Sequence, residues 1–359
     1  MSSPVIDQDM IIEILSRFPA SDVGKSSVLN KECNKRSYES WFLNLNRDRT
    51  NSISGYFAQY SGRGSNCQTR FVYDEKTVSE NNGVSIDFLP PGKIKIEACD
   101  ASHGILLCVN ETRSSVTEYI VCKPTTKQYQ IIPNPTMQTC AVSFGLAVNQ
   151  LNPFGYKILR LSRLPGVINR SHRTFVCEVF DSDSFRWKRI KNLRLPRNDG
   201  LILSKPVHAT RFLHWLSWDG NVIRFCLETE TWSFFKTPNF GVAPTLVRYE
   251  GKLGVSRWWM TGSGEGLNRL WVLKSSFEKA WVKVKDIKRI GRGEHVLWTP
   301  SNDMVTLSSR DRLCVYNVKS EKLSMIHMKK EGTDYVWFPF RSDYERVNMD
   351  ESREAENRN

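Results

Sequence analysis

Histidine is the side chain that most often moves protons or binds metals, and the chain holds six histidines. No two of them are four residues apart, the spacing that puts two metal ligands on one face of a helix: 103, 172, 208, 214, 295 and 327. No G-x-S-x-G motif marks a nucleophilic serine. His214 lies inside the apolar run Phe-Leu-His-Trp-Leu, which favours a hydrogen-bonded core histidine. The sequence therefore predicts no catalytic residue and no metal site.

The cysteines and one glycine-rich loop also give no sign of a cofactor. The nine cysteines, an odd number, are scattered so that no two lie within four residues of each other. Such spacing supplies no zinc pair and no disulfide framework, and it is typical of small buried side chains in a reducing compartment. The loop Gly262-Ser-Gly-Glu-Gly266 lacks the Lys-Ser/Thr that completes a phosphate-binding loop, so we interpret it as a hairpin loop. We expect no cofactor.

Positive charge is concentrated in the middle of the chain. Residues 1–60 hold seven basic and seven acidic residues and residues 341–359 hold four and six, so the middle has 40 basic and 25 acidic residues, net +15. A face of that sign attracts an acidic partner and speeds encounter with it. The densest run surrounds Trp187 with six cations: Arg186, Lys188, Arg189, Lys191, Arg194 and Arg197. It could hold a nucleic-acid backbone, but we favour solvated charges on one face of an outer strand, because basic and apolar residues alternate.

The element expected to position a binding surface lies at the N-terminus. Apolar side chains recur there at helical spacing and form one stripe along about three turns: Ile6, Met10, Ile11, Ile14, Leu15 and Phe18. Pro19 ends this helix, Ser21 offers a cap for a second, and apolar spacing over residues 38–45 predicts a third. Three such short helices bury little surface on their own. The unit therefore needs the rest of the chain or a partner.

Beyond residue 67, segments rich in Val, Ile, Phe, Tyr and Trp alternate with short turns, as in a β-rich domain. A hairpin recurs in which a turn with Thr or Ser precedes an aromatic or apolar residue that opens the next strand, at positions 129, 187, 232, 281 and 323. The intervals of 58, 45, 49 and 42 residues are the size of a propeller blade. Five or six blades of four strands would close a ring, with these hairpins as the outer strands.

Shorter, continuously apolar runs lie between the hairpins: residues 104–108, 144–148, 212–216, 252–255 and 304–307. We expect them to be inner strands, because a strand buried on both faces is apolar throughout. Residues 71–78 would open the first blade or close the last one. Tryptophans outside the hairpin turns, such as Trp215, Trp218 and Trp337, could line the mouth of the ring. Residues 46–67 are polar and glycine-rich, as in a linker, and the charged residues 341–359 are predicted to be disordered.

The N-terminal run resembles an F-box, with matches to that family's first helix at Asp9, Ile11, Glu13, Ile14, Leu15, Arg17, Phe18 and Pro19. Two positions depart from the pattern, since Asp7 replaces an early proline and Cys33 replaces a tryptophan. The following region is similar to the F-box-associated domain of plant proteins, whose strand and turn motifs are matched in order by residues 123–129, 144–161, 178–187 and 225–232. The resemblance implies a three-helix F-box over residues 1–45, a linker over 46–67, a kelch-like β-propeller domain over 68–340 and a disordered tail over 341–359.

The same resemblance implies a non-catalytic, substrate-recognition subunit of a Skp–cullin–F-box ubiquitin ligase. The N-terminal helices would dock on a Skp-type adaptor, and through it on cullin and RING subunits. The adaptor-binding residues are expected to be Ile6, Met10, Ile11, Ile14, Leu15, Phe18, Pro19 and Val23. The propeller would recruit a target protein for ubiquitination, and the charge of the middle region favours an acidic one.

Three alternatives stay open at this stage, and one of them is a nucleic-acid-binding propeller, favoured only by the net charge of +15 in the middle of the chain. A degenerate F-box, indicated by Asp7 and Cys33, would leave a stand-alone propeller that binds an acidic protein or a nucleic acid. A propeller enzyme would need convergent His, Asp or Glu residues, which the sequence does not indicate. No apolar run approaches the 18 residues of a membrane span, and the acidic N-terminus lacks the apolar core of a signal peptide. We therefore expect the cytoplasm or the nucleus.

Overall fold

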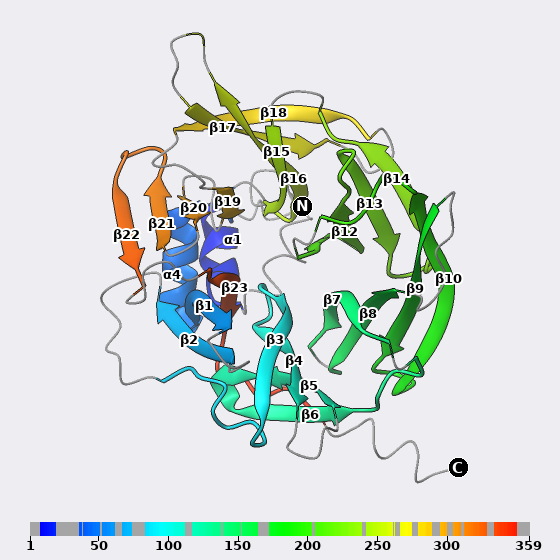
Figure 1. Cartoon of the computed structure of the whole chain (residues 1–359). Coiled ribbons are helices and arrows are strands. Elements are labelled where there is room, and N and C mark those ends of the chain that lie inside the picture. The colour runs from blue at the N-terminus through cyan, green and yellow to red at the C-terminus, as the bar shows by residue number, and fades with distance from the viewer. Residues whose placement is uncertain are drawn as a thin grey trace, which may run out of the picture.

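The structure is a computed structural model of the whole chain. It describes residues 8–18, 36–37, 39–50, 52–61, 67–73, 83–111, 117–137, 139–151, 153–163, 172–202, 205–238, 242–260, 262, 266–274, 279–288, 295–299, 304–309, 312–328 and 334–349. Within these residues, antiparallel strands form six sheets arranged around a ring (Figure 1). The protein is therefore a six-bladed β-propeller, the upper of the two blade numbers expected.

Five blades are built from four consecutive strands each. The first two comprise β3 (Lys93–Asp100), β4 (Ile105–Glu111), β5 (Thr117–Lys123) and β6 (Gln128–Ile132), then β7 (Ala141–Gln150), β8 (Gly155–Arg163), β9 (His172–Asp181) and β10 (Arg186–Pro196). The third comprises β11 (Val207–Ala209), β12 (Phe212–Leu216), β13 (Asn221–Cys226) and β14 (Trp232–Lys236). The last two comprise β15 (Val242–Tyr249), β16 (Lys252–Met260), β17 (Gly266–Leu273) and β18 (Trp281–Lys288), then β19 (His295–Trp298), β20 (Met304–Ser308), β21 (Arg312–Asn317) and β22 (Leu323–His327).

The sixth blade closes the ring with strands from both ends of the chain. Its order is β2 (Cys67–Tyr73), β1 (Ile53–Ser61) and β23 (Val336–Ser342). The first strand of the propeller in the chain, β1, therefore pairs with the last, β23. The expectation of a linker over residues 46–67 is therefore wrong, since β1 lies within it. Tyr56 and Phe57 are neighbours in β1, so their side chains point to opposite faces of the sheet, and both are fully buried, as expected of a strand covered on both faces. Of residues 71–78, which were expected to open the first blade or close the last one, residues 71–73 lie in β2 of this closing blade, and residues 74–78 lie outside those described.

The recurring hairpins are confirmed as the third and fourth strands of the five complete blades. Each hairpin turn contains one residue with a positive φ, two positions before the aromatic or apolar residue of the repeat. These residues are Lys127, Phe185, Glu230, Lys279 and Glu321. Two of the aromatic residues of the repeat, Trp187 and Trp281, also join neighbouring blades. Trp187 donates its indole N–H to the Pro133 carbonyl at 2.7 Å, and Trp281 donates to that of Lys236 at 2.9 Å. The repeated residues therefore form contacts between blades as well as the hairpin turns.

The expected inner strands are mostly second strands. The first strands β3, β7, β11, β15, β19 and β23 contact one another around the ring axis. Of the five apolar runs, only residues 144–148, in β7, lie in a first strand; the others lie in β4, β12, β16 and β20. A second strand is covered on both faces by neighbouring blades, so Ile105, Leu106 and Leu107 of β4 are all buried. A first strand turns one edge to the axis, and β3 alternates in burial.

Among the residues that the structure describes, two helices precede the propeller, α1 (Gln8–Leu15) and α4 (Ser40–Thr50). The predicted three-helix arrangement is not confirmed, because the second predicted helix falls on residues 19–35, which lie outside those described. Phe42 of α4 packs against Ile12 and Leu15 of α1, and these three side chains form a small core of their own. Arg341, at the end of β23, donates to the side-chain oxygen of Asn46 at 2.8 Å. The helices are thereby attached to the blade that closes the ring (Figure 1).

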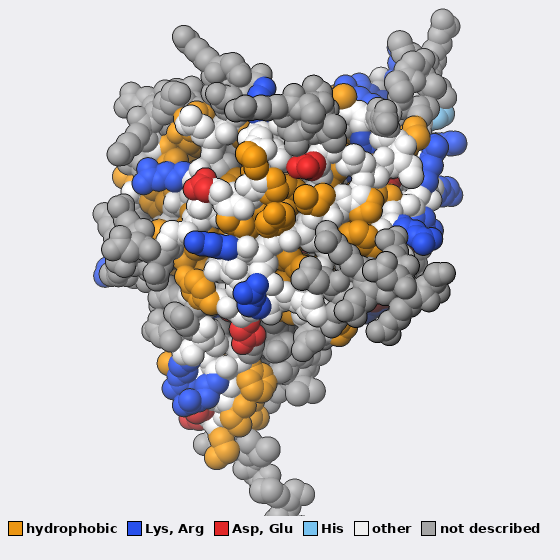
Figure 2. All heavy atoms as spheres, turned by 90° about the horizontal axis from the view of Figure 1, so that it is seen from below, with side chains coloured by type: hydrophobic (Ala, Val, Ile, Leu, Met, Phe, Trp, Pro, Cys, Tyr) orange, Lys and Arg blue, Asp and Glu red, His pale blue; other side chains and the backbone are white. Residues whose placement is uncertain are grey.

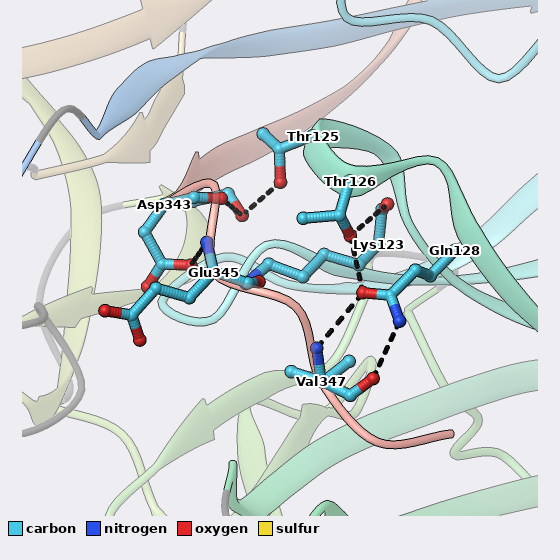
Figure 3. Close-up of polar contacts among 8 residues, drawn as sticks. Lys123, Thr125, Thr126, Gln128, Asp343, Glu345 and Val347 are labelled. Atoms are coloured by element: carbon cyan, nitrogen blue, oxygen red, sulfur yellow. Dashed lines mark hydrogen bonds and ion pairs between the residues drawn. The ribbon is translucent and has the colours of Figure 1, made fainter. Parts of the chain in front are cut away.

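Residues 343–349, the C-terminal strap, run from the end of β23 along the first blade. Lys123, at the end of β5, is fully buried and donates to the carboxylate of Asp343 and the carbonyl of Glu345. Gln128 donates to the Val347 carbonyl at 2.8 Å and accepts from its N–H at 3.1 Å (Figure 3). The expectation of a disordered tail is therefore wrong for residues 341–349. This segment has few apolar residues, but two of them, Val347 and Met349, are buried in the core between the first two blades and hold it in place. Residues 350–359 lie outside those described.

Candidate functional site

The exposed face of the N-terminal helices is the first candidate site. Met10 and Ile14 are 56% and 47% exposed, and Phe18, one turn further, and Trp41 of α4 are also exposed. We call these four exposed side chains the helix stripe. Large apolar side chains at i, i+4 and i+8 on a helix are typical of a surface that a partner covers.

The helix stripe is held by polar contacts behind it. Nδ2 of Asn46 donates to the carbonyls of Ser16 and Phe18, at 3.0 and 2.7 Å, and so satisfies the end of α1, where carbonyls lack helical partners. Glu13 pairs with Arg49 of α4 at 2.8 Å and with Arg17 at 2.9 Å. Hydrogen bonds from Arg49 and then Arg17 hold the pKa of Glu13 below its ordinary value. These contacts hold α1 against α4.

The eight predicted adaptor-binding residues fall into three groups. Met10, Ile14 and Phe18 are exposed and lie in the helix stripe, as the prediction requires. Leu15 is buried against Phe42, and Ile11 is partly buried beside the same core. The six apolar residues of the predicted stripe are spread over more than one side of the helix, so part of them face the core. The remaining three, Ile6, Pro19 and Val23, lie outside the described residues. Trp41 was not predicted as a binding residue, since the apolar spacing over residues 38–45 indicated only a helix.

A cavity of about 530 Å³ on the ring axis is the second candidate site. The first strands of all six blades line it, with apolar side chains such as Leu146, Leu246, Trp337 and Phe338 and with a few charged ones. Of the tryptophans that could have lined the mouth of the ring, Trp337 lines this cavity, whereas Trp215 is buried between blades and Trp218 is exposed. An apolar concave site with few polar groups is the usual form of a small-molecule site.

Asp100, at the end of β3, organises the polar side of this cavity. Its carboxylate is almost fully buried and accepts hydrogen bonds from the backbone N–H groups of Ser102 and Val148, at 3.1 and 3.0 Å. It also contacts Nδ1 of His103 at 2.9 Å and Nδ1 of His208 at 3.3 Å. Burial alone raises the pKa of Asp100, but the two imidazoles outweigh it and hold that pKa well below its usual value. Three blades meet at this one carboxylate.

The described residues contain no group of three or more His, Cys, Asp or Glu side chains placed to hold a metal ion. His214 is buried on β12, and its Nδ1 lies 3.2 Å from the carbonyl oxygen of Val207, which confirms the prediction of a hydrogen-bonded core histidine. Within the same part of the chain, no helix has the length and apolar character needed to cross a membrane.

The predicted basic run forms β10, the outer edge strand of the second blade. Its six cations are all exposed, and Figure 2 shows Lys and Arg side chains grouped along its right edge, the side on which β10 lies in Figure 1. Lys188 is paired with Glu230 of the next blade at 2.9 Å. Trp187 is buried between blades, so its ring is not free to stack on a base. The arrangement matches solvated charges on an edge strand.

Comparison with known proteins identifies the architecture. A family model described as an F-box associated beta propeller domain matches residues 62–299. F-box protein At5g41720 of Arabidopsis thaliana is 48% identical over 170 residues, 45% of this chain and 88% of the relative. F-box protein At5g49610 of the same plant is 23% identical over 358 residues, 92% of this chain and 93% of the relative. Among solved structures, TolB from Acinetobacter baumannii covers 80% of this chain and 66% of its own length at 11% identity with a TM-score of 0.47, too low to support an argument.

The ring of six blades around an axial cavity, preceded by helices with an exposed apolar face, defines the class of the fold as a β-propeller. The chain belongs to the F-box-associated β-propeller family. The propeller extends beyond the matched residues at both ends, because β1 begins at Ile53 and β23 ends at Ser342.

Proposed function

We propose that this protein is the substrate-recognition subunit of a Skp–cullin–F-box ubiquitin ligase. The observation that carries the proposal is the helix stripe, whose Met10, Ile14 and Phe18 are exposed on helices fastened to the propeller through Asn46 and Arg341. Family membership supports the same reading, since the similar Arabidopsis proteins are named F-box proteins. Covering these apolar side chains with a Skp-type adaptor would remove them from water.

In this role the protein contributes proximity rather than chemistry. The adaptor would link the helices to cullin and RING subunits, and the propeller would hold a target protein near the site of ubiquitin transfer. A fixed angle between helices and ring serves this purpose, because a rigid connection limits where the target can lie. The exposed cations of β10 favour an acidic target surface. We place this assembly in the cytoplasm or the nucleus.

The test is adaptor binding by a double variant, Met10→Asp with Ile14→Asp. Both side chains are exposed, so the variant should fold, while two buried charges and two lost apolar contacts should weaken binding to a Skp-type adaptor by at least about 100-fold. The matched control is Val282→Asp with Val284→Asp, two exposed apolar residues of β18 on the ring rim. Calorimetric titration should show full affinity for the control. Equal affinity of the wild type and the helix variant would disprove this docking surface.

The second candidate function is a stand-alone binding module with a degenerate F-box. The exposed cations of β10 favour it, since they would suit an acidic protein or a nucleic acid without any adaptor. The two functions separate in one experiment with the full chain. Failure to bind any Skp-type adaptor, together with RNA or DNA binding that falls steeply with salt, would favour the second function. Adaptor binding with no such nucleic-acid affinity would exclude it.

A further inference from the structure

The axial cavity contains one charged side chain for which the described residues supply no hydrogen-bond acceptor. Lys205 lies just before β11 and lines the cavity. Its Nζ is buried and, among the described residues, has no hydrogen-bond acceptor. It lies instead over the ring face of Phe338. Burial lowers the pKa of this amine well below the usual lysine value, and Glu97 acts in the opposite direction without restoring it.

A buried ammonium without an acceptor is costly, and an aromatic face compensates only in part. Lysines are almost never buried without a partner. A shorter or apolar residue would fill the same space at no such cost, so the position of Lys205 indicates a site for a ligand rather than a packing role. The four-carbon stem is flexible, so Nζ can turn from Phe338 toward a group held in the cavity.

The other charged groups of the cavity already have partners. Asp100 receives its four contacts from two backbone N–H groups and two imidazoles. Arg248 donates to the hydroxyl of Ser102, and Asp334 also has an interaction partner. The unmet requirement is therefore a single acceptor for a single cation. This requirement indicates a ligand with a negative charge, and the apolar lining indicates that the remainder of the ligand is apolar.

We propose that the axial cavity binds a small amphiphilic carboxylate, whose anionic group pairs with Nζ of Lys205 and whose apolar part lies among Leu246, Val296 and Trp337. The volume of about 530 Å³ is within the range of roughly 300–1,000 Å³ that small-molecule sites occupy. A carboxylate fits better than a phosphate, because a phosphate needs several donors and the guanidinium that lines the cavity, that of Arg248, already donates to the Ser102 hydroxyl. The site is distinct from the helix stripe and does not depend on the proposed ligase function.

The test is calorimetric titration of the full chain with butanoate, hexanoate and octanoate, and with hexanamide as the uncharged counterpart of hexanoate. We expect one binding site per chain, affinity that rises with chain length, and hexanamide at least about tenfold weaker than hexanoate. Binding should also take up protons, increasingly so at higher pH, because the carboxylate restores the lowered pKa of Lys205.

The matched variants are Lys205→Met, which keeps the length of the stem without the charge, and Lys191→Met, an exposed lysine of β10. Lys205→Met should lose about tenfold or more in hexanoate affinity and all proton uptake, while its melting temperature stays equal or rises because a buried charge is gone. Lys191→Met should bind as the wild type does. The proposal is wrong if no carboxylate binds, if hexanamide binds as well as hexanoate, or if a folded Lys205→Met variant binds as the wild type does.

Discussion

His214 lies in the middle of β12, almost fully buried, with its ring nitrogen on the carbonyl of Val207. Burial lowers the pKa of this imidazole to about 3, and Arg224 on the paired strand β13 adds to that effect, while the hydrogen bond to Val207 opposes it. The folded protein therefore holds the neutral ring at pH values where the unfolded chain, with a histidine pKa of about 6.5, is protonated. Stability is unaffected above that unfolded pKa and falls as the pH drops below it.

We predict that His214→Gln makes the protein less sensitive to acid. Glutamine carries no charge at any pH and can still donate to the Val207 carbonyl, whereas the wild type should lose about 1.4 kcal/mol per pH unit below the unfolded pKa. Between pH 7.5 and pH 5.0, urea unfolding should show a loss roughly 2 kcal/mol larger for the wild type than for the variant. His172, exposed to a greater degree at the start of β9, provides the control as His172→Gln. Parallel pH profiles for all three proteins would contradict the assigned role.

At the scale of elements, the C-terminal strap is fastened by Lys123, whose ammonium is fully buried and paired with Asp343. Breaking a buried ion pair on one side costs more than removing both partners, because the remaining charge is left without compensation. Lys123 is also the last residue of β5, next to the turn Pro124–Thr126. The strap and the first blade therefore depend on each other.

We predict that Asp343→Ala lowers the free energy of unfolding by about 3 kcal/mol or more, as for other buried pairs that lose one partner. Adding Lys123→Met should recover most of that loss, since the unpaired cation is then replaced by an apolar side chain of similar length. Urea unfolding of the two single variants and the double variant measures the coupling. Additive losses in the double variant would mean that the pair is not energetically coupled.

At the scale of the molecule, the ring closes through β1, which lies between β2 and β23. Residues 62–299, which the family model matches, include neither β1 nor β23. Phe57 of β1 packs edge to face on Phe71 and Phe340, with ring centroids 4.9 and 5.1 Å away. Tyr56 reaches the neighbouring blade, where its hydroxyl bonds that of Thr306. One short strand thus joins the beginning of the propeller to its end.

We predict that a chain beginning at residue 52 folds, whereas a chain beginning at residue 62 does not. The first lacks only α1, α4 and the residues around them. The second loses the four buried hydrophobic side chains of β1, of which the larger ones contribute about 1.5–3 kcal/mol each, and it exposes two sheet edges. Together these losses rival the whole stability of about 5–15 kcal/mol of a typical protein. Circular dichroism and thermal melting distinguish the two chains. A cooperative transition in the shorter chain would show that the ring closes without β1.

The periodic parts of the fold were accessible from the sequence. The five outer hairpins were located correctly, because each turn carries its own local signal in residues such as Thr229 and Thr231 of the β13–β14 turn, and because the following aromatic repeats at blade intervals. The exposed residues Met10 and Ile14 were also found, since helical spacing shows which side chains share a face. It does not show which face is covered, so buried Leu15 was grouped with them.

The closing blade, the strap and the axial cavity were not predictable in this way. Asp100 and Lys205 come from blades more than 100 residues apart, and neither stands in a motif. Strand β1 carries apolar residues such as Tyr56 and Phe57 but lies within a polar, glycine-rich stretch, and its burial depends on pairing with β2 and β23, which are distant from each other in the chain. The sequence by itself determined the elements and their repeat, because hydrogen-bonded turns and apolar periodicity are local properties of the chain. Only the tertiary structure decided which strand is innermost, what closes the ring and which charge is left without a partner, because burial depends on residues distant in the chain.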